Sequence, residues 1–153
     1  DYGDTVIIEQ ENDTDTDMKP NTKAFSNMDE FIAEVGARPI VIQGGWCDYS
    51  SIELLSNSDL GQSLTTKYVD EDGLQLTIVQ RWNSNTDISF ISEGVGFEER
   101  PILNDIVMYC TIDQYDHTFS GVALLDDSIL MVGAEEGIDI ELLLDSLGEY
   151  TKL

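Results

Sequence analysis

Apolar residues near the start of the chain are spaced by three and four positions, as in a helix with one buried face. The residues that carry this spacing are Met28, Phe31, Ile32 and Val35. Ser26 has the side chain of a good N-cap and is followed three residues later by Asp29. Gly36 stands where a glycine commonly ends a helix. The sequence therefore predicts a helix from about residue 26 to residue 36.

From residue 39 onward the spacing of apolar residues changes to two, which is typical of β-strands. The strongest signal is a pair of alternating runs around Asp70–Gly73, an acidic turn that ends in glycine. A second pair surrounds Asp126 and Asp127. Both patterns predict antiparallel hairpins. We expect strands at residues 39–43, 51–55, 64–69, 74–79, 88–91, 106–112, 118–125 and 128–132.

Helical spacing returns at the end of the chain. Asp139 can cap a helix that runs to about Leu147, and Gly148 can end it. The buried stripe of this helix would consist of Ile140, Leu143, Leu144 and Leu147. The order of elements predicts an α+β fold: a curved antiparallel β-sheet, a half-barrel-like meander, with an N-terminal and a C-terminal helix packed on one face.

Residues 1–24 differ in composition from the remainder and are expected to form an acidic arm or linker. The arm holds one short strand-like run at residues 6–8, and residues 9–23 are polar, aperiodic and interrupted by a proline. Residues 25–153 are expected to form a single α+β domain. Within the arm, Asp13, Asp15 and Asp17 alternate as in a calcium-binding loop, although Met18 and Ala24 replace the Gly and Glu of an EF-hand. They are the candidate Ca²⁺ ligands, and a solvated linker is the alternative.

Two stretches carry a resemblance to a known family. The sequence PIVIQGGW followed by SLTTKYVDEDGLQLTIVQRW, and the closing GVALLDDSILMVG with IELLLDSL, resemble a domain of unknown function from Gram-positive bacteria. That domain forms the extracytoplasmic C-terminal end of anti-sigma-factor-like membrane proteins or of lipoproteins. The resemblance covers residues 25–150 and departs from the family at residues 122–125, which lack the usual Trp. It implies an extracytoplasmic location and a sensing or interaction role, and it assigns no catalytic residue.

The charge of the chain narrows the choice of partners. Seven basic residues face 31 acidic ones, which gives a formal net charge of −24. Nucleic acid is excluded because its phosphates are bound by clustered Lys and Arg, and here the cations are scattered. An anionic membrane surface would repel the domain for the same reason. Cationic partners are favoured. Because the chain begins with Asp1 and carries no signal peptide, we expect a trimmed or mature form with its targeting or anchoring segment upstream.

The two cysteines, Cys47 and Cys110, match no zinc or redox motif. In an oxidising compartment a bridge between them would close a long loop, worth about 4 kcal/mol in the chain-entropy model. Two buried free thiols are the alternative. The only imidazole, His117, lies in a polar turn with Asp113 and Asp116 and without a nucleophile motif.

Acidic pairs occur at Glu98 with Glu99, at Asp126 with Asp127 and at Glu135 with Glu136, but adjacent strand residues point to opposite faces. We therefore expect no catalytic residues, no enzyme activity and no cofactor.

Four aromatic residues at predicted strand ends and turns are the candidate ligand-binding residues: Trp46, Tyr49, Trp82 and Tyr115. Our leading hypothesis is a non-catalytic, extracytoplasmic sensor or protein-interaction domain of a bacterial cell-envelope protein. The alternative is a ligand-carrying module that binds a lipid, peptide or glycan on the concave face of the sheet.

Overall fold

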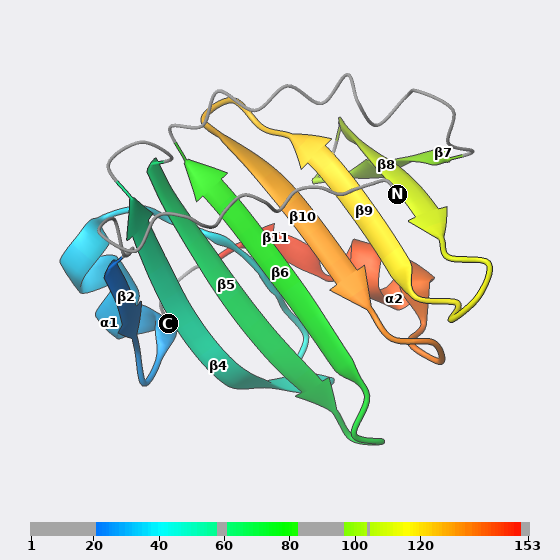
Figure 1. Cartoon of the computed structure of the whole chain (residues 1–153), viewed down its shortest axis with the longest axis horizontal. Coiled ribbons are helices and arrows are strands. Elements are labelled where there is room, and N and C mark those ends of the chain that lie inside the picture. The colour runs from blue at the N-terminus through cyan, green and yellow to red at the C-terminus, as the bar shows by residue number, and fades with distance from the viewer. Residues whose placement is uncertain (1–20, 58–60, 83–96, 104, 151–153) are drawn as a thin grey trace, which may run out of the picture.

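The protein is built around one open antiparallel sheet of eight strands, seen face-on in Figure 1. The computed structural model describes residues 21–57, 61–82, 97–103 and 105–150. Along the sheet the strands are β2 (Asn21–Ala24), β4 (Cys47–Asn57), β5 (Gly61–Asp70), β6 (Gln75–Trp82), β10 (Ser128–Ala134), β9 (Phe119–Leu124), β8 (Ile106–Ile112) and β7 (Glu98–Ile102). A smaller sheet pairs β3 (Ile40–Ile42) with β11 (Leu147–Glu149), and the helices are α1 (Met28–Val35) and α2 (Ile140–Asp145).

The strand order corrects the prediction of a simple meander. In a meander β7 would lie beside β6, but β10 occupies that position and β7 forms the far edge. Strand β10 pairs with β6 along its whole extent, from Ser128 opposite Trp82 to Ala134 opposite Leu76. No edge of β6 is then left for β7, whose five residues pair with β8 alone.

The first helix begins one residue later than predicted. Asn27, not Ser26, is the N-cap, and its side chain accepts a hydrogen bond from the Glu30 backbone N–H at 3.0 Å. Glu30 in turn accepts one from the backbone N–H of Ser26 at 3.0 Å, so that the two side chains satisfy backbone donors reciprocally. The predicted end is confirmed, because Gly36 adopts a left-handed conformation with φ of 85°.

The last helix is shorter than predicted. Asp139 caps it as expected, but it ends at Asp145 rather than near Leu147. Residues 147–149 instead form β11, because pairing with β3 provides partners for their backbone groups.

Three other differences concern strands. Residues 21–24, assigned from sequence to the arm, form edge strand β2 against β4. Strand β4 is longer than the predicted 51–55, and β7 was not predicted at all. The strand-like runs at residues 6–8 and 88–91 lie outside the described residues.

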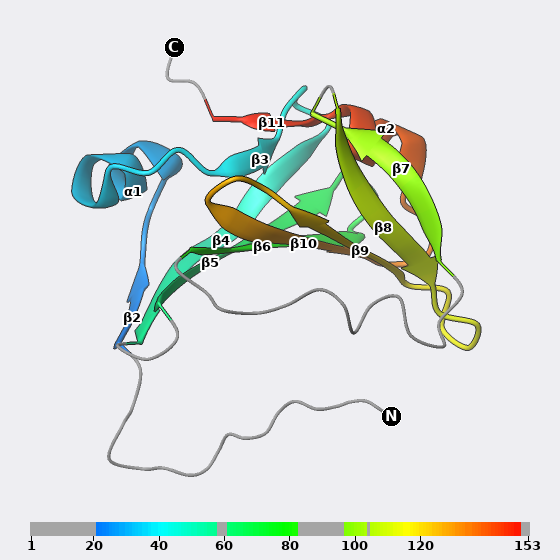
Figure 2. The ribbon, with the colours of Figure 1, turned by 90° about the horizontal axis from the view of Figure 1, so that it is seen from above.

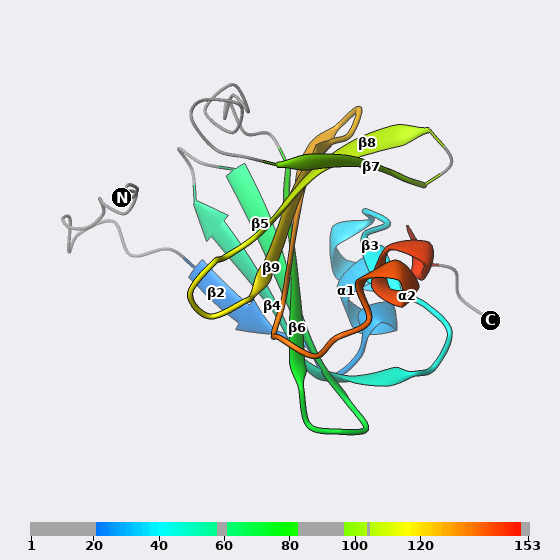
Figure 3. The same ribbon diagram turned by 90° about the vertical axis from the view of Figure 1, so that its right-hand side faces the viewer.

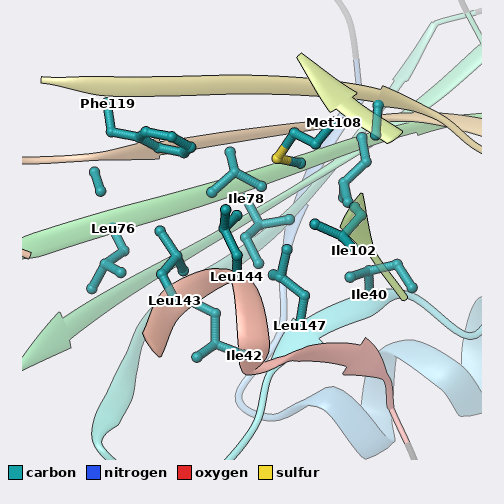
Figure 4. Packing of buried hydrophobic residues seen from close by; sticks show 14 of the residues in the cluster. Ile40, Ile42, Leu76, Ile78, Ile102, Met108, Phe119, Leu143, Leu144 and Leu147 are labelled. Atoms are coloured by element: carbon teal, nitrogen blue, oxygen red, sulfur yellow. The ribbon is translucent and has the colours of Figure 1, made fainter. Parts of the chain in front are cut away.

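The side chains on one face of the large sheet are buried, and we call this the inner face. Figures 2 and 3 show the β3–β11 ribbon, α1 and α2 on the same side of the sheet. Most of the inner face packs with α2, β3 and β11 into the larger core cluster, part of which appears in Figure 4. The remainder packs with α1 into a second cluster composed of Met28, Phe31, Val41, Ile52, Leu54, Leu64 and Trp82.

Strand β3 is held over the sheet by two buried side chains. In the pairing of β3 with β11, Val41 lies opposite Gly148. Because alternate residues of an antiparallel strand direct their N–H groups to opposite edges, those of Ile40 and Ile42 point away from β11. Gln80 of β6 accepts from the Ile40 N–H at 2.8 Å, and the Tyr68 hydroxyl of β5 accepts from the Ile42 N–H at 3.2 Å. The Gln80 amide also donates to Ser128 Oγ at 2.8 Å. These bonds satisfy two donors that would otherwise be buried without partners.

We predict that Gln80→Met destabilises the fold by about 1–3 kcal/mol, because it leaves the buried Ile40 N–H without an acceptor, while the Ser128 hydroxyl keeps its hydrogen bond to Asp127. Urea unfolding followed by circular dichroism measures the difference. Gln75→Met is the matched control, since Gln75 is exposed on the same strand and its substitution is expected to change stability by less than about 0.5 kcal/mol. Equal stability of the two variants would contradict this role of Gln80.

Candidate functional site

The face of the sheet opposite the inner face, which we call the outer face, carries a row of apolar side chains. Val79, Met131, Val122 and Tyr109 are directly opposite one another on β6, β10, β9 and β8. Directly opposed residues of antiparallel strands point to the same side of a sheet. These four residues alternate with the buried inner-face row, so they face away from the core.

A second row widens this apolar area. Leu124 on β9 is 55% exposed and Val107 on β8 is 41% exposed, both unusually high for large aliphatic side chains. Ile129 is opposite Leu124 on the same face but is only 5% exposed, so it is not part of the exposed apolar area. We define the outer patch as Val79, Val107, Tyr109, Val122, Leu124 and Met131.

The outer patch is confined to one half of the sheet. On β4 and β5 the same row continues as Glu53 and Thr65, and the exposed Lys67 lies on the same face as Thr65. An antiparallel sheet with one solvated face normally has polar residues there, as this half does. The apolar half is thus a departure that calls for a specific explanation. Acidic side chains lie near it at Glu99, Asp126 and Asp127.

A pocket of about 450 Å³ lies on the inner side near the start of β7. Its lining residues are Phe97, Glu98, Arg100, Cys110, Thr111, Ile112, Phe119 and Ile140. Arg100 Nη1 contacts Glu141 Oε2 of α2 at 2.6 Å, and Arg100 Nε lies 3.6 Å from Glu98 Oε1. The hydrogen bond to Glu141 is the main cause that raises the pKa of Arg100 above its ordinary value.

The four aromatic residues predicted to bind a ligand are distributed over the molecule. Trp82 is buried and stacks on Phe31 with ring centroids 6.3 Å apart. Trp46 packs against the larger cluster and donates from Nε1 to Ser146 Oγ at 2.9 Å. Both indoles therefore contribute to packing.

The two tyrosines of that group are more exposed. Tyr49 is 42% exposed, its ring lies 5.0 Å from that of Tyr68, and its partial burial raises its pKa. Tyr115 is 83% exposed in the turn between β8 and β9. Neither lines the pocket or the outer patch, so the structure places them apart from both surfaces.

Of the two states considered for Cys47 and Cys110, a disulfide bridge or two free thiols, the structure has free thiols at both positions. Strands β4 and β8 are separated in the sheet by β5, β6, β10 and β9. Five interstrand steps of about 4.8 Å correspond to roughly 24 Å along the sheet, whereas a disulfide needs Cα atoms within about 7 Å. Burial is the main cause that raises the pKa of each thiol to about 11.

The polar groups considered for catalysis have local roles. Asp113 accepts hydrogen bonds from the backbone N–H groups of Tyr115 and Asp116, at 2.7 and 3.1 Å, and so organises the turn that holds His117. Asp116 accepts from the Thr118 N–H and hydroxyl, and these bonds lower its pKa. Glu98 lies opposite Cys110 and Glu99 opposite Tyr109, so this acidic pair divides between the two faces as expected.

The candidate Ca²⁺ ligands Asp13, Asp15 and Asp17 lie outside the described residues. Within the described part of the chain, no group of three or more His, Cys, Asp or Glu side chains is arranged to hold a metal ion. No helix among the described residues is long and apolar enough to cross a membrane.

Sequence reasoning missed both the outer patch and the pocket around Arg100. A signal for the patch was present, because residues 106–110, 122–125 and 129–132 are unbroken apolar runs. Such runs are typical of strands that are covered on both faces. The pocket gave no comparable signal, since Arg100 and Glu141 are 41 positions apart and meet only through packing of β7 near α2.

Comparison with known proteins gives no assignment: no family model, no curated protein and no solved structure matches this chain.

We predict that the two thiols of the folded protein react slowly with iodoacetamide at pH 8. Each thiol has its pKa raised from 9.0 to about 11. At pH 8 this rise of two pKa units lowers the fraction of thiolate, the reactive form, by roughly 100-fold. The rate should rise with pH until the pH passes about 11, and urea should abolish the protection. Quantification of alkylated Cys47 and Cys110 by mass spectrometry measures this. Alkylation at pH 8 as fast in the native as in the unfolded protein would contradict it.

Proposed function

We propose that this chain is a non-catalytic, extracytoplasmic interaction or sensor domain of a bacterial cell-envelope protein, and that the outer patch is its docking surface. The observation that carries the proposal is the apolar half of an otherwise polar outer face. Contiguous exposed apolar areas are a mark of protein-interaction sites. The location follows from the family resemblance of residues 25–150.

The inner face provides less room for a partner than the outer patch does. Its central side chains, such as Leu76, Ile78 and Leu130, are no more than 1% exposed, because α2, β3 and β11 cover them. A filled core of this kind supports docking at the surface rather than carriage of a large ligand beneath the sheet. Among the described residues of the outer patch, Leu124 and Val107 are exposed and the other four are half-buried.

We also propose that the sheet is curved as a half-barrel with both helices on its concave side. Support comes from the view in Figure 3, in which β7 and β8 turn toward the side that holds α1 and α2. The ion pair between Arg100 of β7 and Glu141 of α2 fits this shape. The outer patch then occupies the convex side of the bend.

Charge defines the partner further. Glu99, Asp126 and Asp127 lie near the patch, and the chain as a whole carries a net charge of −24. Complementary potentials speed encounter and suppress wrong partners. The partner is therefore a protein surface with an apolar centre surrounded by Lys or Arg.

Site-specific photocrosslinking in the native envelope tests the proposal. With p-benzoylphenylalanine in place of Leu124 we expect one discrete crosslinked product, because that side chain would lie within the interface. The matched control replaces Lys67, which is exposed on the polar half of the same face, and should give no such product. A second change, Val107→Glu, should reduce the Leu124 product at least about tenfold by placing a charge in an apolar contact.

Circular dichroism of the purified variants checks that each one folds. No product at position 124, or products of equal yield at positions 124 and 67, would overturn the docking surface.

A further inference from the structure

The pocket near the start of β7 lies where the inner face extends beyond its covering helix. Ile112 and Phe119 are opposite each other on β8 and β9, and Phe119 is 3% exposed whereas Ile112 is 58% exposed. Ile140, the first residue of α2, is the helical residue among the described ones that line the pocket. The pocket thus has an apolar wall, and its volume of about 450 Å³ is in the range of small-molecule sites.

Glu98 and Arg100 line the pocket, and Glu141 of α2 lies beside it through its contact with Arg100. One cation, Arg100, contacts two carboxylates, Glu141 and Glu98. The Cys110 thiol adds no charge at neutral pH, since burial raises its pKa to about 11. The guanidinium is already engaged, while the two carboxylate side chains are 74% and 70% exposed and retain oxygens for a further donor.

We propose that this pocket binds a small organic cation with an apolar body, such as an alkyl- or arylalkylammonium ion. The ammonium group would lie beside Glu98 and Glu141, and the apolar body would contact Ile112, Phe119 and Ile140. A carboxylate ligand would have to displace Glu141 from Arg100 and approach a chain with a net charge of −24. The inference goes beyond the proposed docking function and concerns the opposite side of the sheet, so each can fail without the other.

Three probes of equal size test the ligand class: 3-phenylpropylammonium, 3-phenylpropanol and 3-phenylpropanoate. Each is titrated into the ¹³C-methyl-labelled protein, and the methyl signals of Ile112 and Ile140 are followed by NMR. We expect the ammonium to bind roughly tenfold more tightly than the alcohol. A roughly tenfold difference in Kd is what two weak contacts between exposed opposite charges provide. The carboxylate should bind most weakly. Equal or tighter binding of the alcohol or the carboxylate would overturn the proposal.

Charge-removing variants separate a specific site from the general acidity of the chain. Glu98→Gln and Glu141→Gln should each weaken binding of 3-phenylpropylammonium by about three- to fivefold, the range expected for one exposed charge pair. Glu53→Gln is the control, because Glu53 is an exposed acid on the outer face of β4. If all three variants weaken binding equally, or if the shifts spread over the acidic surface instead of Ile112 and Ile140, the pocket is not the binding site.

Discussion

The arrangement of the whole molecule depends on two side chains that satisfy the backbone of a short strand. One edge of β3 pairs with β11. The N–H groups of Ile40 and Ile42 lie on the opposite edge, where they would be buried without partners. Gln80 and Tyr68, both on central strands of the sheet, provide the acceptors. A two-stranded ribbon is marginal by itself, and these bonds fix it over the sheet together with the apolar contacts around it. Burial raises the pKa of Tyr68 above its ordinary value, so its hydroxyl stays neutral.

The fixed position of the ribbon makes the two faces of the sheet different. One face is covered by β3, β11 and the helices, and its residues form the two core clusters. The cover ends near α2, where Ile112 is exposed and the pocket around Arg100 opens. On the opposite face, the apolar half formed by β6, β10, β9 and β8 stays outside both clusters. The proposed docking surface and the proposed cation site both follow from this asymmetry.

Much of the local structure was predictable from sequence, because periodicity reports which side chains face a core. The hairpin around Asp70–Gly73 is present, with Asp70 accepting from the N–H groups of Asp72 and Leu74 and with Gly73 at φ of 85°. The bounds of β8 agree with the prediction. Strand order was not predictable, because alternation does not identify the neighbour of a strand, and so β10 rather than β7 lies beside β6.

The same limit explains the missed site. Strand β7 could not be predicted because it begins with the charged residues Glu98 and Glu99, which do not show the alternation of apolar and polar residues typical of a strand. The strand order decides how far apart Cys47 and Cys110 lie and brings Arg100 next to Glu141. Because the sequence does not give this order, neither result could be predicted from it.

The central claim is that the centre of the inner face is covered while Leu124 and Val107, in the apolar half of the outer face, are accessible. Paramagnetic relaxation of methyl NMR signals by an inert, soluble nitroxide measures this directly. The account predicts strong broadening for Leu124 and Val107 and almost none for Leu130 and Val132, which are buried on the inner face. Equal protection of the two groups would contradict an accessible outer patch, and equal broadening would contradict a covered inner face.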